Sequence, residues 1–500
     1  MKAKVNYLQR ILASNVYDVA VKTPLDEATA LSKKLGVRFL LKREDLQPVH
    51  SYKIRGAYNK MSRLSRAELD KGVICASAGN HAQGVALSAK KLGVKATIVM
   101  PVTTPEIKTS AVKAYGATIV LHGDSYSDTY EELHRQIKEH GYTYVAPFDD
   151  PDVIAGQGTV GKEILEAAGR ELDAVYVPIG GGGLASGVAV YIKSVKPEVR
   201  VYGVEPVDSD CMYRSLKAGR RVTLANPGLF ADGVCVKEPG VETFRLCREH
   251  LDGIVRVTTA ETCAAIKDIF EATRAICEPA GALALAAAKK HAKKGGTVAC
   301  VISGANMNFD RIRFVSELTE AGEGREALFD CMLPERPGSF LRFVSKIGKR
   351  NVTEFNYRMG DPEEAHVFVG ISVKNAEDRA ALAKGFTSAG FDCVDLSEND
   401  VAREHVRHMV GGAVKVTDEV LYSFEFPERP GALMKFLSVI AGRWNISLFH
   451  YRNHGSDYGK VLVGFQVAKT DRAAFLAALE EIGYKYIDVT NDPVCRGFLR

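Results

Sequence analysis

Lys53 is the first residue whose type and surroundings point to covalent chemistry. It lies in the segment His50-Ser51-Tyr52-Lys53-Ile54-Arg55-Gly56-Ala57, with polar residues before it and the amphipathic stretch IRGAYNKMSRL after it. We therefore expect Lys53 at the start of a helix that faces a cleft. A lysine whose pKa is lowered by burial can form a Schiff base with a carbonyl cofactor. An ordinary surface lysine is the alternative, and Lys53 alone does not decide between the two.

A second polar segment, Ser77-Ala78-Gly79-Asn80, ends the apolar run VICAS (73–77) and opens a helix-like stretch. Such a loop presents backbone N–H groups at a helix N-terminus, where a carboxylate binds favourably. The side-chain amide of Asn80 could also hydrogen-bond a ring hydroxyl. A plain helix cap and turn is the alternative interpretation.

Four consecutive glycines, Gly180-Gly181-Gly182-Gly183, precede Leu184 and separate the apolar run AVYVPI from a helix-like stretch. Glycines let the backbone approach a phosphate closely, and the dipole of the following helix favours the anion. Because glycines weaken packing unless a ligand compensates, a purely structural role does not suit this run. The spacing Gly180-x-Gly182-x-x-Ala185, with Glu205 ending the next strand, also imitates a dinucleotide-binding fingerprint. A Rossmann NAD-dependent oxidoreductase is therefore an alternative.

Ser303 ends the last apolar run of this region, in Val301-Ile302-Ser303-Gly304-Ala305-Asn306. A serine at the carboxyl end of a strand can hydrogen-bond an uncharged ring nitrogen. A Schiff-base lysine, an anion-binding loop with an asparagine, a phosphate loop and this serine together predict a pyridoxal 5'-phosphate site. The dinucleotide alternative leaves Lys53, the 77–80 loop and Ser303 without a role. No C-x-x-C or other zinc-ligand spacing is present, so we expect no metal site.

The elements that must position these residues alternate over residues 1–320. Short apolar, β-branched runs at 37–42, 73–77, 96–101, 117–122, 174–179, 199–205, 253–257 and 298–303 are separated by amphipathic stretches such as 81–93, 158–171 and 261–274. Apolar strands separated by helices indicate parallel sheets covered on both faces. Because 320 residues are many for one sheet, we expect two α/β lobes that share a cleft at the carboxyl ends of the strands.

The remaining chain contains an internal repeat. Residues 328–358 match residues 421–452, with PERPG at 334–338 recurring at 427–431, and VFVGISV (367–373) recurs as VLVGFQV (461–467). Each copy shows the order strand, turn, helix, strand, strand, helix, strand, which is typical of a ferredoxin-like βαββαβ unit. We therefore predict a catalytic domain over 1–320 and two small modules over 327–399 and 420–490.

Composition excludes several classes of protein. The 500 residues carry a net charge of only +5, without a run of basic residues, which argues against a nucleic-acid partner or a membrane-surface role. No apolar run reaches the roughly 20 residues that a membrane span needs. The N-terminus is a poor secretory signal. The ten cysteines are widely spaced, and we expect them to be reduced, buried thiols of a soluble cytoplasmic protein.

The motifs S-x-K-I-R-G-A, A-S-A-G-N-H-A-Q-G, G-G-G-G-L and S-G-A-N together resemble those of the biosynthetic threonine ammonia-lyases (threonine dehydratases), of the tryptophan-synthase-β-like, fold type II pyridoxal-phosphate class. The resemblance covers nearly the whole chain, and the repeat is similar to the two ACT-like regulatory modules of that family. It implies that Lys53 carries pyridoxal 5'-phosphate and removes the α-proton of the substrate. It also implies that the backbone of Gly180–Leu184 holds the phosphate, Asn80 the ring hydroxyl, Ser303 the ring nitrogen and Ser77–Asn80 the substrate carboxylate.

The resemblance also implies the reaction and its control. L-threonine would yield 2-oxobutanoate and ammonia, as the first step of isoleucine biosynthesis, with L-serine a weaker substrate. Isoleucine would inhibit and valine would relieve the inhibition, with Tyr357 and Tyr451, equivalent in the repeat, near the effector sites. A homotetramer is the family expectation. Glu278-Pro279-Ala280-Gly281 resembles a family segment that lines the cleft without a defined role. A serine dehydratase or serine racemase, which share the catalytic core, and a purely structural repeat are the alternatives.

Overall fold

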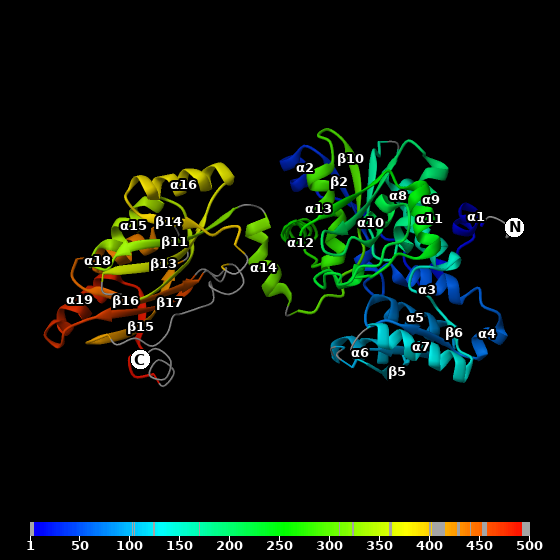
Figure 1. Cartoon of the computed structure of the whole chain (residues 1–500), viewed down its shortest axis with the longest axis horizontal. Coiled ribbons are helices and arrows are strands. Elements are labelled where there is room, and N and C mark those ends of the chain that lie inside the picture. The colour runs from blue at the N-terminus through cyan, green and yellow to red at the C-terminus, as the bar shows by residue number, and fades with distance from the viewer. Residues whose placement is uncertain are drawn as a thin grey trace. The chain divides into compact units, whose positions relative to one another are not determined.

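The structure, a computed structural model, describes residues 5–492 except 103, 105, 124–125, 170, 310, 323–324, 360–362, 400–401, 403–415, 428–430, 441 and 453–457. Most of the second PERPG turn, at 428–430, therefore lies outside the described residues. The chain divides into two compact units, Met1–Gly322 and Glu323–Arg500 (Figure 1).

The larger lobe of the first unit is built on a six-stranded sheet. Its order is β1 (Leu25–Glu27), β2 (Arg38–Arg43), β10 (Thr297–Ile302), β7 (Ala174–Pro178), β8 (Arg200–Pro206) and β9 (Gly253–Val257). All neighbours are parallel except β1, which pairs antiparallel with β2. The helices of this lobe are α1 (Tyr7–Leu12), α2 (Thr29–Leu35), α8 (Pro151–Ala168), α9 (Gly183–Val195), α10 (Cys211–Ala218), α11 (Val241–His250), α12 (Thr259–Thr273), α13 (Pro279–His291) and α14 (Arg311–Gly322). The short turns η1 (Val16–Asp18), η2 (Glu44–Leu46) and η3 (Asp232–Val234) join them.

The smaller lobe has a four-stranded parallel sheet in the order β5 (Thr118–Leu121), β4 (Ala96–Met100), β3 (Val73–Ala76) and β6 (Thr143–Tyr144). Helices α4 (Arg66–Asp70), α5 (Asn80–Leu92), α6 (Glu106–Lys113) and α7 (Tyr126–His140) belong to this lobe (Figure 1). Helix α3 (Lys53–Met61) packs on α5 on one side and on α8 on the other, so it joins the two lobes. The predicted two-lobed parallel-sheet class is confirmed.

The second unit contains two copies of the βαββαβ order. The first copy is β11 (Glu326–Pro334), α15 (Ser339–Ile347), β12 (Val352–Arg358), β13 (Glu364–Ser372), α16 (Ala376–Ser388) and β14 (Asp392–Asp395). The second is β15 (Glu419–Pro427), α18 (Ala432–Ile440), β16 (Asn445–Arg452), β17 (Tyr458–Gln466), η5 (Lys469–Asp471), α19 (Arg472–Ile482) and β18 (Lys485–Asp488). The predicted ferredoxin-like order is therefore found in both copies.

The two copies share one antiparallel sheet of eight strands, in the order β14-β11-β13-β12-β16-β17-β15-β18. The join is β12 against β16, where Asn356 lies opposite His450, Phe355 opposite Tyr451 and Tyr357 opposite Phe449. Because Phe355 and Phe449, and likewise Tyr357 and Tyr451, are equivalent in the repeat, the pairing is symmetric about the Asn356–His450 pair. The two modules are thus related by a local pseudo-twofold axis.

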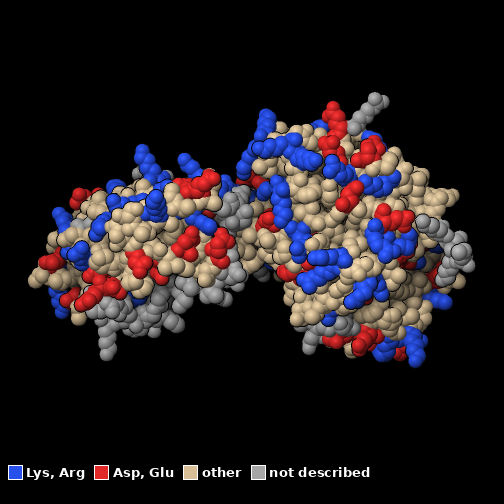
Figure 2. Space-filling model, turned by 45° about the horizontal axis from the view of Figure 1, so that its top comes forward, with Lys and Arg blue, Asp and Glu red and all other residues tan. Residues whose placement is uncertain are grey.

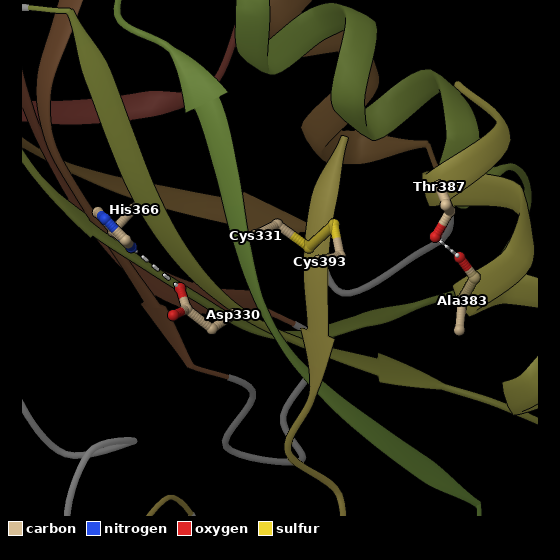
Figure 3. The surroundings of a disulfide bond; sticks show 6 residues. All are labelled: Asp330, Cys331, His366, Ala383, Thr387 and Cys393. Carbon is tan, nitrogen blue, oxygen red and sulfur yellow. Dashed lines mark hydrogen bonds and ion pairs between the residues drawn. A yellow bond between two sulfur atoms is a disulfide. The ribbon is translucent and has the colours of Figure 1, made fainter. Parts of the chain in front are cut away.

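A disulfide joins Cys331 on β11 to Cys393 on β14, which lie directly opposite each other in the sheet (Figure 3). The expectation that all cysteines are reduced was therefore wrong for this pair. Widely spaced cysteines gave no sign of it, because 62 residues separate the two along the chain. In the second module the equivalent cross-strand pair is Phe424 and Tyr486, whose ring centroids lie 5.9 Å apart.

On the face shown in Figure 2, Lys and Arg are interspersed among Asp and Glu. Within the described part of the chain, no helix is both long enough and apolar enough to cross a membrane.

Candidate active site

Lys53 is the first residue of α3. Its Nζ donates a hydrogen bond to the carbonyl oxygen of Pro147 at 2.9 Å and lies 5.5 Å from the centre of the Tyr52 ring. Burial lowers the pKa of Lys53 to about 8, although the nearby Glu278 carboxylate opposes this shift. An appreciable fraction of the amine is therefore neutral near pH 7, as a nucleophile or a base requires.

The turn before α3 is tied to the end of β10. The backbone N–H of Tyr52 donates to the carbonyl oxygen of Ser303 at 3.2 Å, and the Ser51 hydroxyl donates to the same oxygen at 3.3 Å. His50, with φ of 53°, adopts a left-handed conformation that is unusual for a non-glycine residue. The N–H of Ala305 donates to the carbonyl oxygen of His50 at 2.9 Å and helps to hold it. The segment before Lys53 and the end of β10 at Ser303 are thus held together by one set of hydrogen bonds.

The predicted carboxylate loop leads into α5, whose first residue is Asn80. The Ser77 hydroxyl accepts a hydrogen bond from the N–H of Gly79 at 3.2 Å. A Cβ added at Gly79 would meet no heavy atom within 4 Å, so the loop borders open space there. The Asn80 amide is held by Glu278 and Asn306, at 2.8 and 2.7 Å.

The glycine run forms the turn between β7 and α9. Gly182 precedes α9 with φ of 97°, and the helix begins at Gly183. The first N–H groups of a helix lack partners within it and attract anions. Packing also requires the glycines, since a Cβ at Gly181 would lie 2.3 Å from the Phe148 ring and one at Gly183 would lie 3.0 Å from Phe148 Cα. Because Leu184 is buried in the core, only its backbone faces this turn.

The segment that joins these parts, Pro147-Phe148-Asp149, was not predicted from the sequence. Pro147 accepts from Lys53, whereas Phe148 packs on the glycine turn. The Asp149 carboxylate accepts from the N–H groups of residues 241–243, at the start of α11, at 2.9–3.2 Å. The Thr243 hydroxyl in turn donates to the carbonyl oxygen of Gly181 at 2.6 Å. A loop of this kind between β6 and α8 has no periodic pattern that would reveal its contacts.

Glu205, which suggested a dinucleotide-binding alternative, has another role in the structure. Its side chain is fully buried, and it accepts hydrogen bonds from the N–H groups of Met212 and Tyr213, at the start of α10, at 2.9 and 2.8 Å. The carboxylate therefore caps a helix and is not available to bind a ribose hydroxyl.

A buried network of charges anchors the middle of α3. The Arg55 guanidinium bonds the Glu44 carboxylate at 2.7 Å and the Glu163 carboxylate at 2.6 Å, and Lys42 also bonds Glu163. All four side chains are at most 1% exposed. Burial alone would raise the pKa of Glu163, but Arg55 and Lys42 hold it below its ordinary value. The network connects β2, η2, α3 and α8, and so fixes the helix that begins with Lys53.

The residues around Lys53 fit pyridoxal 5'-phosphate. The cofactor needs an amine for its aldehyde and a backbone cradle for its phosphate. The Lys53 amine and the glycine turn meet the same short segment at adjacent residues, Pro147 and Phe148. Asn80 is linked through Asn306 to the carbonyl oxygen of Val49, in the segment before Lys53, and the carbonyl oxygen of Ser303 accepts from Tyr52, the neighbour of Lys53.

The second unit has a solvent-open hollow that both modules line. Glu335, Arg336 and the start of α15 come from the first module, and Trp444 with the end of α18 comes from the second. Asn445 donates to the Glu335 carboxylate at 3.0 Å, and the Tyr357 hydroxyl donates to it as well. Tyr357 thus lies behind the hollow, whereas Tyr451 is a buried residue of β16 that does not line it.

Fold and site together define a pyridoxal-phosphate dependent enzyme, and residues 16–304 match the family of that description. Residues 317–406 and 410–499 each match the C-terminal regulatory domain of threonine dehydratase. The chain is 54% identical to the biosynthetic L-threonine dehydratase of Burkholderia multivorans, over 99% of this chain and all of that protein. The chain therefore belongs to the biosynthetic threonine dehydratases.

Solved structures agree with this assignment. The processed form of threonine deaminase isoform 2 from Solanum lycopersicum is 49% identical, with a TM-score of 0.61, over 62% of this chain and 87% of that one. A serine racemase from maize is 32% identical, with a TM-score of 0.59, over 63% of this chain and 97% of that one. The maize protein is aligned over nearly its whole length with less than two thirds of this chain, so it is about as long as the first unit.

Proposed function

We propose that this enzyme converts L-threonine to 2-oxobutanoate and ammonia with pyridoxal 5'-phosphate carried on Lys53. The observation that carries the proposal is the Lys53 amine, whose pKa is lowered to about 8 by burial and which lies at the start of α3. Its contact with Pro147 sets it beside the segment on which the glycine turn packs.

Each predicted residue has a task in this proposal. The backbone of Gly180–Leu184 holds the phosphate, Asn80 donates to the ring hydroxyl, and Ser303 meets the ring nitrogen. The 77–80 loop at the start of α5 receives the substrate carboxylate, because helix N-termini favour anions. The neutral hydroxyl of Ser303 leaves the ring nitrogen without a charged partner.

Lys53 is also the base of the reaction. When bound, the cofactor supplies a ring that accepts negative charge from the α-carbon of the substrate. With the substrate bound, the neutral Nζ of Lys53 would be free to take the α-proton. Burial lowers the pKa of His81 to about 3, so this imidazole stays neutral and does not compete for the proton. Loss of the β-hydroxyl as water, followed by addition of water, would then give 2-oxobutanoate and ammonia.

The test is an absorption spectrum of the purified enzyme before and after L-threonine is added. We expect a violet-absorbing band that changes on addition while 2-oxobutanoate accumulates, and a Lys53→Ala variant that lacks both. The matched control is Lys60→Ala on the same helix. Lys60 forms an ion pair with Asp150, with 2.8 Å between Nζ and Oδ2, so this variant should keep the absorption band and the activity. A colourless protein that binds a nicotinamide nucleotide would refute the proposal.

L-serine should be a poorer substrate rather than an excluded one, because one methyl group discriminates by only about 1–3 kcal/mol. Serine dehydratase or serine racemase activity is the alternative function. The match of both modules to a threonine dehydratase regulatory domain favours threonine. Comparison of kcat/KM for the two amino acids, with D-serine as a product to be detected, separates these possibilities.

We propose, second, that the hollow in the second unit binds a branched-chain amino acid, with isoleucine as inhibitor and valine as its antagonist. A free amino acid presents an ammonium group, a carboxylate and an apolar side chain. Glu335, Arg336 with the N-terminus of α15, and the apolar wall of Leu437, Ile440 and Trp444 match these three parts. An effector there regulates only if it binds one conformational state more tightly than another.

Trp444 makes this site directly observable, because it is the single tryptophan of the chain. Isoleucine should change its fluorescence over the same concentrations that inhibit the enzyme, and Glu335→Gln should weaken both effects about tenfold or more. Glu364→Gln on the neighbouring strand β13 is the control and should leave both unchanged. Inhibition without any change in tryptophan fluorescence would place the effector elsewhere.

The family resemblance alone supports a homotetramer and a cytoplasmic location. Sedimentation equilibrium and cell fractionation test these two parts of the proposal.

A further inference from the structure

Hydrogen bonds fix the orientation of the Asn80 side-chain amide from both ends. The Asn306 amide nitrogen lies 2.8 Å from the carbonyl oxygen of Val49, which can only accept, and 2.7 Å from Asn80 Oδ1. The atom of Asn80 that faces Asn306 must therefore be its oxygen. The nitrogen of Asn80 consequently faces Glu278, whose Oε1 accepts from it at 2.8 Å.

Glu278 is itself held firmly. It precedes α13, its backbone N–H donates to the carbonyl oxygen of Gly304 at 3.1 Å, and its side chain is almost completely buried. Two glycines leave room for the carboxyl group. A Cβ at Gly304 would lie 2.8 Å from Glu278 Oε1, and one at Gly233 would lie 3.2 Å from it.

The side chains of Glu278, Asn80 and Asn306 thus form one continuous chain of hydrogen bonds. A buried carboxyl group costs free energy unless it is hydrogen-bonded, and burial raises the pKa of Glu278 to about 7. An amide has two N–H groups, and Asn80 uses only one of them on Glu278. Among the described residues, none accepts the second N–H, which leaves it for a ligand.

We infer that Glu278 is a positioning residue that acts through Asn80: with Asn306 it holds the Asn80 amide so that the free N–H serves the ring oxygen of the cofactor. The inference rests on the proposed function, because it takes pyridoxal 5'-phosphate as the ligand of Asn80. Glu278 stabilises bound cofactor only as long as Asn80 is present.

A double-mutant cycle tests the inference through cofactor affinity. The dissociation constant of pyridoxal 5'-phosphate is measured by absorbance titration of the full-length apo forms of the wild type, Glu278→Ala, Asn80→Ala and the double variant. We expect Glu278→Ala to weaken binding about tenfold in the wild-type background and less than about twofold in the Asn80→Ala background. Glu278→Gln keeps an acceptor oxygen and should restore binding to within about threefold of the wild type.

Equal losses in both backgrounds would show that Glu278 acts independently of Asn80 and would overturn the inference alone. If the wild type itself does not bind the cofactor, the proposed function fails and the inference fails with it. Asn306→Ala provides a second cycle with the same expectation if Glu278→Ala does not fold, because Asn306 holds the opposite end of the amide.

Discussion

At the scale of single residues, the proposed role of Lys53 predicts how the rate of cofactor binding depends on pH. Burial lowers the pKa of Lys53 to about 8, and only the neutral amine attacks an aldehyde. The rate at which apoenzyme combines with pyridoxal 5'-phosphate should therefore rise about tenfold between pH 7 and pH 9 and then level off. Stopped-flow absorbance over pH 6–10 measures this profile.

A control for that profile comes from the neighbouring carboxyl group. Glu278 raises the pKa of Lys53 in opposition to burial, so in Glu278→Gln the midpoint should move to lower pH. A rate that keeps rising through pH 10, as for an ordinary lysine amine, would contradict the lowered pKa.

Residue types in local motifs could be predicted, but their partners could not. The sequence directed attention to Lys53, Asn80, Ser303 and the glycine run because each stands in a polar or glycine-rich break after an apolar run. The partners are remote: Pro147 lies 94 residues from Lys53, and Glu278 lies 198 residues from Asn80. Such contacts depend on how the elements pack, which no local pattern encodes.

At the scale of elements, the buried charges hold α3 against α8. Glu163→Gln should lower the free energy of unfolding by about 3–5 kcal/mol, because Arg55 and Lys42 would lose their charged partner inside the protein. Urea denaturation measures the change. The control on the same helix is Glu166→Gln, which should leave the free energy of unfolding nearly unchanged because its ion pair with Lys22 is exposed to solvent.

The ion pairs of Glu163 with Arg55 and Lys42 also predict how the stability loss in Glu163→Gln depends on pH. The pKa of Glu163 is below its ordinary value in the folded protein. Its contribution is therefore complete above the ordinary carboxyl pKa of about 4.3 and is lost as the pH falls through the lower folded value. The difference between wild type and Glu163→Gln should persist at pH 5; a difference that vanishes there would contradict this account.

The disulfide predicts that the oxidised and reduced chains differ in the number of cysteines that can be alkylated. Alkylation of the unfolded protein should modify two more cysteines after treatment with dithiothreitol than before it, and peptide mapping should assign them to Cys331 and Cys393. Closing a loop with a separation of 62 residues is worth about 4 kcal/mol by chain entropy. Equal alkylation before and after reduction would show that the bond does not form.

Element boundaries followed from the sequence where strands were long and apolar. All eight predicted strands of the first unit occur within two residues of their expected ends, whereas β1 and β6 were missed because they have only three and two residues. Helix α8 begins at Pro151, seven residues before the predicted start at 158. The Asp150 side chain caps its first turn and Pro151 occupies the first helical position, a start signal that the glycines within the helix obscured.

At the scale of the whole molecule, the two units should be separable in function. Deleting residues 323–500 should leave threonine turnover within a few-fold of the full chain and abolish the response to isoleucine, because the first unit contains all the proposed catalytic residues. Steady-state kinetics with and without isoleucine measure both effects. A truncated enzyme that isoleucine still inhibits would contradict the placement of the effector site.

The repeat predicted two modules, but it did not predict their union in one sheet. The pairing of β12 with β16 uses backbone groups at the edge of each module, and an edge strand carries no sequence mark of its partner.

The join of β12 to β16 has a consequence for how this protein can respond to dilution. Two identical single modules paired in this way would form a homodimer, and a hollow lined by both would disappear as the dimer dissociated. Here the two halves belong to one chain, so their encounter is intramolecular and their effective concentration is set by the connecting segment. The proposed effector site would therefore persist at any cellular abundance of the enzyme. The two halves are also free to diverge in sequence, as the Cys331–Cys393 and Phe424–Tyr486 pairs already have.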